Sequence, residues 1–212
     1  MSSAQGDAVA AIALAHAGCS SRSPDPADVA RYAELLLRPS EAASTAQRAY
    51  YLANPALSTC ALTVLGCWRL AGLPDLEVQG PYYPNRVGKA FADMEAVGTR
   101  HGAWEAGPPR GPLLAGDVWI ITAPDGSDGH TGLVTADQEL VTDPLATVEG
   151  GQFDGKGSTA IGTFSRALRW EGAGVGLRCF MGARVIYGVI RAAALPIPVL
   201  ADDPGPMPAA AT

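Results

Sequence analysis

Clusters of basic residues and long apolar runs are both missing from this sequence of 212 residues. It holds 15 Lys and Arg against 21 Asp and Glu, a formal net charge of -6, and the basic residues form no run. Binding to a nucleic-acid backbone needs clustered Lys and Arg, so we expect no nucleic-acid partner. No stretch reaches the roughly 20 consecutive apolar residues that cross a bilayer, so we expect no membrane span.

The four cysteines follow no metal-binding or disulfide pattern. Cys19, Cys60, Cys67 and Cys179 include no C-x-x-C pair, and no pair of histidines lies beside them. We therefore expect no zinc site and no disulfide framework. At least one thiol is then available for chemistry, while Cys67 and Cys179 are expected to be structural.

The two ends of the chain differ in composition from its middle. An Ala-rich apolar stretch lies near the N-terminus, but Asp7 stands where a secretion signal would carry a positive charge. We interpret this stretch as a helix packed on the domain. Five prolines over 196–212 predict a poorly ordered tail. The expected organisation is a helical N-terminal elaboration over 1–50, a core over 51–195 and the Pro-rich tail.

The hydrophobic pattern changes its period along the chain. Helical spacing predicts helices over 7–18, 26–37, 40–53, 60–71 and 89–98. Strand-like patterns follow over 117–122, 130–136, 146–150, 161–170 and 183–190. Helices followed by a run of strands predict an α+β fold with a mostly antiparallel sheet. The helix 60–71 is apolar on nearly every face, so we expect it to be buried against the sheet.

Cys60 begins this buried helix. A thiol attacks an amide as the thiolate, and the pKa of an unperturbed Cys is about 8.5. The N–H groups and dipole of a helix N-terminus favour the thiolate, and a neighbouring imidazolium does so too. His130 is one of three histidines and starts a strand directly after a turn. That position predicts a rigidly held base facing Cys60.

The imidazole needs a third group that fixes its tautomer and orientation. Glu149, on the predicted strand 146–150, is the first choice, and Asp143 and Gln152 are the alternatives. Backbone N–H groups at the start of the helix 60–71 would stabilise an oxyanion.

Polar and aromatic residues near these elements are candidates for binding a substrate. Tyr82, Tyr83 and Trp104 lie in loops rich in Gly and Pro, and Gln152 follows the strand of Glu149. For the three rings, packing beneath the loops is an equally good interpretation. Asp117, which precedes an apolar strand, is expected to cap a turn.

Four blocks of the sequence, taken in order, resemble CHAP-type amidases and related NlpC-type peptidases. STCALTVLGCWRLAG resembles the helix that begins at their catalytic Cys, and LLAGDVWII resembles the strand that a Gly-Asp pair enters. GHTGLVTA resembles the strand of the catalytic His, which a Gly follows two residues later, and TVEGG resembles the strand of the third residue. The resemblance covers roughly residues 50–190.

The resemblance implies a papain-like (CHAP/NlpC-type) fold that hydrolyses amide bonds of bacterial peptidoglycan, in a stem peptide or a cross-bridge, without metal or organic cofactor. It assigns Cys60 as nucleophile, His130 as base and Glu149 as orienting residue, with a thioester acyl-enzyme. This chain departs from the family's pattern at Thr59, where relatives often have Asp or an aromatic residue. It departs again at Gly151-Gln152, where a helper Asn often follows.

Other functions remain compatible with the sequence. One is an intracellular thiol peptidase or acyltransferase on the same fold, and another is a non-catalytic binding module that retains the fold. A wall substrate implies action in the cell wall or periplasm, although the sequence shows no clear signal peptide. Residues 20–50 exceed what a catalytic core requires, and covering or shaping a cleft is one use for them.

Overall fold

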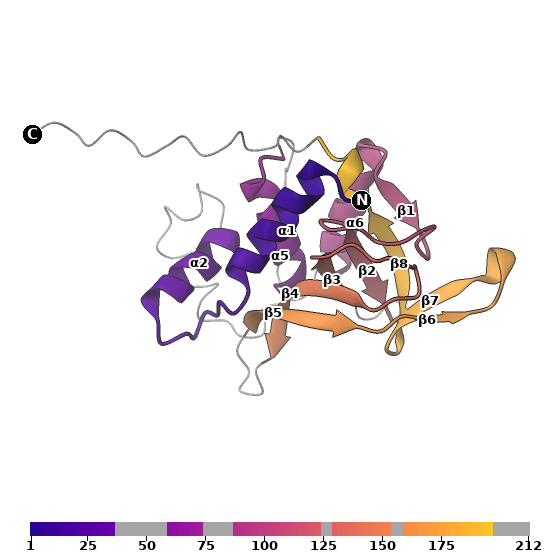
Figure 1. The fold of residues 1–212 in the computed structure, drawn as a ribbon. Helices are drawn as coiled ribbons and strands as arrows, with labels where there is room; N and C mark the ends of the chain where they lie inside the picture. Colours follow the sequence, from indigo (N-terminus) through magenta and orange to yellow (C-terminus); the bar gives the residue numbers. More distant parts are fainter. Residues whose placement is uncertain (37–58, 74–86, 124–128, 154–158, 197–212) are drawn as a thin grey trace, which may run out of the picture.

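A computed structural model of the 212-residue chain describes residues 1–36, 59–73, 87–123, 129–153 and 159–196 (Figure 1). These residues form four α-helices and an eight-stranded antiparallel sheet. The predicted α+β class with helices on an antiparallel sheet is confirmed. The expected helix over 40–53 and the tail from 197 onward lie outside the described residues.

The helices begin close to the positions predicted from sequence. They are α1 Ala4–His16, α2 Pro26–Leu36, α5 Cys60–Leu70 and α6 Val87–Arg100. Ser3 caps α1, because its side chain accepts a hydrogen bond from the N–H of Gly6. No described helix is long and apolar enough to cross a bilayer.

The sheet has the strand order β5-β4-β3-β2-β8-β7-β6, with β1 also paired to β8. Its strands are β1 Trp104–Ala106, β2 Val118–Thr122, β3 Gly129–Val134, β4 Leu145–Phe153, β5 Thr159–Arg166, β6 Arg169–Glu171, β7 Arg178–Met181 and β8 Arg184–Ile190. The predicted strand 161–170 is wrong as a single element, because it divides into β5 and β6. The short strands β1 and β7 were not predicted, since three or four residues carry little periodicity.

The strand β8 is paired on both of its edges. On one edge β2 pairs along residues 185–190, and on the other β7 pairs with residues 184–185 and β1 with residues 188–190. The hairpin of β6 and β7 therefore continues the sheet beyond β8, and it extends away from the helices (Figure 1).

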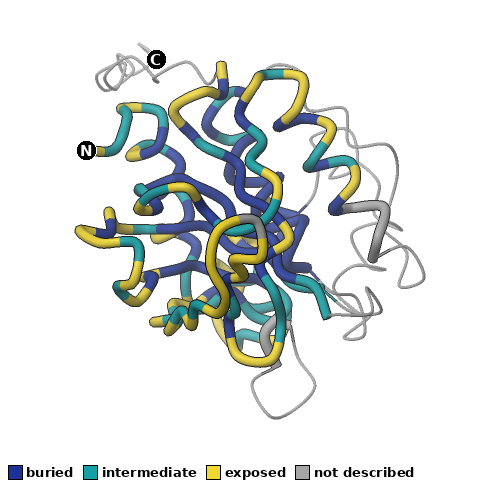
Figure 2. Tube along the Cα trace, turned by 90° about the vertical axis from the view of Figure 1, so that its right-hand side faces the viewer, coloured by how far each residue is buried: buried dark blue, intermediate teal, exposed yellow. Residues whose placement is uncertain are grey.

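The two faces of the sheet pack into separate cores. Val118 and Ile120 of β2 belong to the core that contains α5, whereas Trp119 and Ile121 belong to a second core with β7 and β8. This division follows from the alternation of side chains along a strand. Buried residues run through the middle of the molecule, and exposed residues gather on its outer turns (Figure 2).

The helix α5 lies between the sheet and the N-terminal helices. It contacts β3 and β4 on one side and α1 and α2 on the other. Trp68 and Val64 are fully buried, as expected for a helix that is apolar all round. Gly66 allows α2 to approach, because a Cβ there would lie 2.0 Å from the carbonyl oxygen of Leu35.

The described N-terminal residues pack on the rest of the chain. A Cβ on Gly116 would lie 2.4 Å from the Cα of Gly6, so α1 meets the turn before β2 at a contact of two glycines. Ser20 forms an isolated bridge with Ala160 of β5. Tyr32 of α2 is fully buried. These contacts make α1 and α2 a layer over α5.

Candidate functional site

Cys60 is the first residue of α5 and is 3% exposed. The first turn of a helix has N–H groups without intrahelical acceptors. The N-cap residue Thr59 makes no side-chain capping bond to them, and its buried hydroxyl has no partner among the described residues. Within the part of the chain that the structure describes, the start of α5 therefore presents backbone donors beside a thiol without a cap from Thr59.

Gly150 holds β4 against this end of the helix. A Cβ at Gly150 would lie 1.8 Å from Oγ1 of Thr63 and 2.9 Å from the carbonyl oxygen of Thr59. Only a residue without a side chain allows so close an approach. The preceding residue of β4, Glu149, is thereby placed near the start of α5.

The strands β3 and β4 separate where the site lies. Within the described strands, they pair at Leu133↔Val148 and Val134↔Thr147. Beyond that point the pairing of β4 with β5 shifts register between Glu149 and Gln152. Glu149 and Gly150 therefore lie outside the pairing with β3, where β4 meets the start of α5, and the side chain of Glu149 lies on the opposite face of the sheet beside Trp119.

His130 lies on that opposite face, in β3. Its ring contacts Trp119 edge-on at 5.6 Å between centroids, and Trp119 belongs to the second core. The Nε2–H of His130 donates to Oε2 of Glu149 over 2.8 Å. His130 also forms a side-chain hydrogen bond with Cys60. Because Nε2 is engaged by Glu149, Nδ1 is the ring nitrogen left for the thiol.

The charge state of His130 follows from its neighbours. Burial lowers the pKa of His130, but the hydrogen bonds and charges of Cys60 and Glu149 outweigh it and raise the pKa to about 9. An imidazolium is therefore the favoured form at neutral pH. It lies beside the thiol, as a cysteine nucleophile requires.

Glu149 is fully buried, and four donor contacts occupy its carboxylate. Oε2 accepts from His130 and from Nη2 of Arg166. Oε1 accepts from Nε of Arg166 at 2.6 Å and from the hydroxyl of Thr147 at 2.7 Å. Burial raises the pKa of Glu149, but the donors Arg166, His130 and Thr147 lower it to about 2. The side chain is thus a permanent anion with its acceptor sites filled.

Gly132 makes room for this arrangement. A Cβ on Gly132 would lie 2.6 Å from Cζ2 of Trp119 and 2.7 Å from Cγ of Glu149. The glycine two residues after His130 therefore lets Trp119 and the side chain of Glu149 pack together beside the imidazole.

The structure places the other candidates elsewhere or leaves them undescribed. The carboxylate of Asp143 accepts from the N–H of Leu140 in a turn. Trp104 lies in β1 and pairs with Ile190 of β8. The centroid of its ring lies 5.7 Å from that of Tyr187. Tyr82 and Tyr83 lie outside the described residues, and the backbone of Gln152 pairs with Ala160 of β5.

The other three thiols differ from Cys60 in their surroundings. Burial raises the pKa of Cys67 far above its usual range and raises the pKa of Cys179 to about 12. Burial also raises the pKa of Cys19, against the opposing charge of Arg31. Each of these thiols stays protonated at neutral pH, in keeping with the structural role expected for Cys67 and Cys179.

Two residues of the cluster were not predicted: Arg166 and Thr147. Thr147 and Glu149 share a face of β4 because they are two apart, and this signal is present in the sequence. Arg166 reaches Glu149 from β5, where it lies opposite Leu145, and the sequence does not reveal this pairing. Among the described residues, no group of three His, Cys, Asp or Glu side chains could hold a metal ion.

Comparisons with protein-family models, with curated proteins and with solved structures gave no match for this chain.

Proposed function

We propose that this protein is a papain-like cysteine amidase or peptidase with Cys60 as nucleophile, His130 as acid and base, and Glu149 as orienting residue. The observation that carries the proposal is the continuous set of side-chain contacts from Cys60 through His130 to Glu149. The helix α5 supplies the thiol, and two consecutive strands much later in the chain, β3 and β4, supply the imidazole and the carboxylate. A base held between a thiol and a fixed carboxylate is the arrangement of nucleophilic catalysis.

The chemistry begins with the thiolate of Cys60, paired to the imidazolium of His130. The sulfur attacks the carbonyl carbon of an amide, and the carbonyl electrons move onto the oxygen. The N–H groups in the first turn of α5, which the side chain of Thr59 does not cap, are donors for this oxyanion. His130 gives its Nδ1 proton to the leaving nitrogen as the C–N bond breaks, which leaves a thioester on Cys60.

Water completes the cycle. His130 accepts a proton from the water as its oxygen attacks the thioester carbon, and the C–S bond then breaks. The products are the free carboxylic acid and the regenerated thiolate and imidazolium. Glu149 takes no proton in this sequence, because its acceptor sites are filled by protein donors.

The substrate proposed is an amide bond of bacterial peptidoglycan. It is supported by the resemblance of four sequence blocks to CHAP-type amidases and NlpC-type peptidases, which have the order Cys, Gly-Asp, His and acidic strand. A buried helix that begins at a Cys and packs on an antiparallel sheet agrees with the papain-like part of that resemblance. Action outside the cytoplasm follows from this choice of substrate.

The low exposure of Cys60, at 3%, favours a second candidate function. A thiol sealed from solvent would belong to a non-catalytic module that keeps the fold. The two functions differ in whether the sulfur is reachable. An intracellular thiol peptidase or acyltransferase would use the same three residues and would differ in its substrate.

Digestion of purified peptidoglycan, followed by mass spectrometry of the released muropeptides, tests the proposal. We expect new amine and carboxylate termini from the wild-type protein and none from Cys60→Ala. Cys179→Ala is the matched control, because it removes a buried thiol outside the site and should keep the activity. Unaltered digestion by Cys60→Ala would show that another group is the nucleophile.

Alkylation with iodoacetamide separates an enzyme from a module. Cys60 should react well before Cys67 and Cys179, with an apparent pKa below the reference of about 8.5. Equal rates at all three thiols would favour the non-catalytic module. Fast alkylation of Cys60 without muropeptide products would instead support a thiol enzyme and reject peptidoglycan as its substrate.

A further inference from the structure

Arg166 makes a two-bond contact with the carboxylate of the site. Its Nε donates to one oxygen of Glu149 at 2.6 Å, and its Nη2 donates to the other. The guanidinium also lies over the ring of Phe164, 4.4 Å from the ring centroid. The planar fork of Arg matches a carboxylate in this way, which a Lys ammonium does not. Both the charge and the orientation of Glu149 are therefore fixed from β5.

A fully buried carboxylate needs such a partner to stay ionised. Burial acts against the charge of Glu149, and His130 is the second cation in contact with it. His130 is itself shared with Cys60. Arg166 thus supplies a positive charge that is independent of the catalytic proton, and it balances a site that otherwise holds two acids and one base.

We propose that Arg166 is a positioning residue that keeps Glu149 ionised and aimed at His130, so that the Cys60–His130 ion pair persists into acid solution. This inference rests on the proposed function for its catalytic consequence, but the ion pair can be measured without a substrate. Arg166 is 31% exposed in its side chain, so it can be replaced without opening a sealed core.

The groups that determine the pH dependence are few. Glu149 is faced by His130 from β3 and by Arg166 from β5, and Thr147 on its own strand adds an uncharged hydroxyl. His130 is faced by Cys60 from α5. Trp119 of β2, which packs beside the imidazole, does not titrate.

The test is the pH profile of Cys60 alkylation by iodoacetamide in Arg166→Gln, Arg166→Lys and Thr147→Val. Without the charge of Arg166, the cluster keeps two acids, Cys60 and Glu149, beside the imidazolium of His130, so both acids take up protons at higher pH. The acid edge of alkylation in Arg166→Gln should therefore move up by about one pH unit or more. Arg166→Lys keeps the charge without the fork, so its edge should lie between those of wild type and Arg166→Gln. Thr147→Val removes one uncharged donor and should shift the edge least.

The outcomes separate this inference from the proposed function. A uniform loss of alkylation at every pH, with the acid edge unmoved, would show that Arg166 is only structural and would overturn the inference. Equal edges for Arg166→Lys and Arg166→Gln would overturn the role of its charge. If circular dichroism shows that Arg166→Gln does not fold, the acid edges of Arg166→Lys and Thr147→Val test the inference: it predicts a larger shift for Arg166→Lys than for Thr147→Val. A shifted acid edge in a protein that cleaves no amide would support the role of Arg166 and reject the proposed hydrolase function.

Discussion

Two buried carboxylates of this protein, Asp117 and Glu149, are each held by an arginine, yet their partners differ in kind. Asp117 accepts from the backbone N–H groups of Leu114 and Ala192, at 3.0 and 2.9 Å, and from Arg191 at 2.8 Å. The donors from His130, Arg166 and Thr147 to Glu149 are side chains, and His130 also contacts a thiol. The backbone donors to Asp117 link separate segments of the chain. The donors to Glu149 include His130, whose protonation state matters for a reaction at the thiol.

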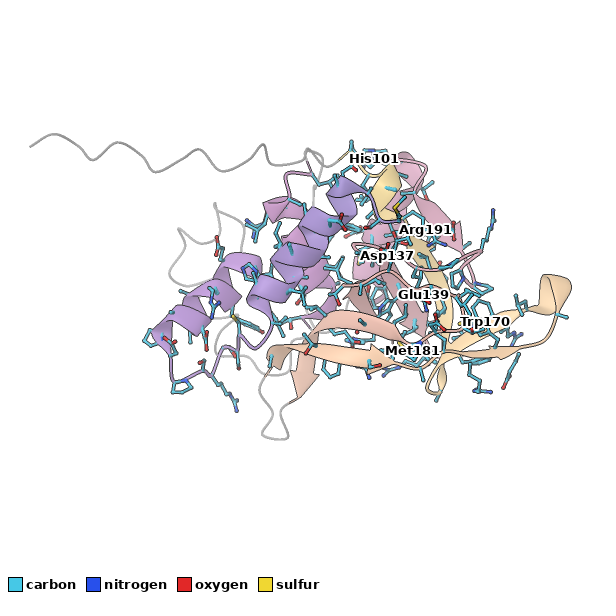
Figure 3. All side chains as sticks on the ribbon, in the orientation of Figure 1. His101, Asp137, Glu139, Trp170, Met181 and Arg191 are labelled. Carbon is cyan, nitrogen blue, oxygen red and sulfur yellow. The ribbon has the colours of Figure 1, made fainter. Side chains whose placement is uncertain are left out.

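The Asp117 cluster lies at the opposite end of the sheet from His130. Arg191 follows the end of β8, where Figure 3 labels it, and it also binds Glu105 of β1 at 3.0 Å. Burial raises the pKa of Asp117 in spite of its donors, whereas the donors lower the pKa of Glu149 to about 2. The comparison indicates that Asp117 joins β1, β2 and the segment after β8, as the turn-capping expectation partly anticipated, and that Glu149 serves the site.

Substitutions at Glu149 and Asp117 test whether the two carboxylates have different roles, and we expect them to have the largest effects on activity and stability. Glu149→Gln keeps the shape but donates an N–H toward the imidazole or toward Arg166, so it disturbs the tautomer of His130. We expect muropeptide release to fall by about 10³–10⁴-fold, as for loss of an orienting carboxylate. Asp117→Ala removes one acceptor of Arg191, which keeps Glu105 and the carbonyl of Pro112, and leaves the N–H groups of Leu114 and Ala192 without theirs, which should cost about 1–3 kcal/mol of unfolding free energy for each N–H.

The two variants should differ in both measurements. Denaturant unfolding and single-turnover rates on the same preparations give stability and activity separately. Asp117→Ala should keep the wild-type rate per folded molecule. If both variants lose only stability, the Glu149 cluster is a structural clamp like that of Asp117, and the comparison fails.

The pH dependence of the unfolding free energy tests the charges of His130 and Glu149, and we expect it to be the next largest effect. The pKa of His130 is raised to about 9 in the folded protein from an ordinary 6.5, so its stabilisation is complete below 6.5 and is lost as pH rises through 9. The pKa of Glu149 is lowered to about 2 from 4.5, so its stabilisation is complete above 4.5 and is lost as pH falls through 2. These two groups therefore contribute most between about pH 4.5 and 6.5.

Denaturant melts from pH 4 to 10 measure this window. His130→Gln should flatten the decline in stability between pH 6.5 and 9. An alkaline decline of the same slope in His130→Gln would mean that other groups cause it.

Gly132→Ala tests how closely the Glu149 cluster is packed and carries the smallest expected effect. The added Cβ would press on Trp119 and on Glu149, so we expect a loss of about 1–3 kcal/mol from overpacking. Gly182→Ala is a steric control, because a Cβ at Gly182 meets nothing within 4 Å, although its φ of 63° adds backbone strain. Equal thermal stability of wild type and Gly132→Ala would show that the cluster has room to adjust.

The sequence allowed the main elements to be predicted because their hydrophobic periods are long and regular. The apolar segment 60–71 could only be a buried helix, and its Cys at the first turn gave the candidate nucleophile. His130 was found because the chain has only three histidines and one of them starts a strand. Glu149 was chosen over Asp143 from its place on a strand, and the structure brings Glu149, not Asp143, to the imidazole.

The rest depended on information that a single sequence does not carry. Arg166 lies opposite Leu145 in the pairing of β5 with β4, four residues from Glu149, and a single sequence does not give this register. The contact between the start of α5 and the opposite face of the sheet depends on where β3 and β4 cease to pair. Trp104 was assigned to a loop, but pairing with β8 makes it part of a strand that is too short to show an alternation.

The separation of β3 from β4 has a mechanical consequence. The sulfur of Cys60 belongs to the layer of helices and the imidazole of His130 to the far face of the sheet, so their contact joins two layers of the fold. A small sliding of α5 along the sheet would change the distance between thiol and ring while leaving each layer intact. The rate of thiol alkylation can therefore serve as a gauge of how firmly the two layers are fixed to each other.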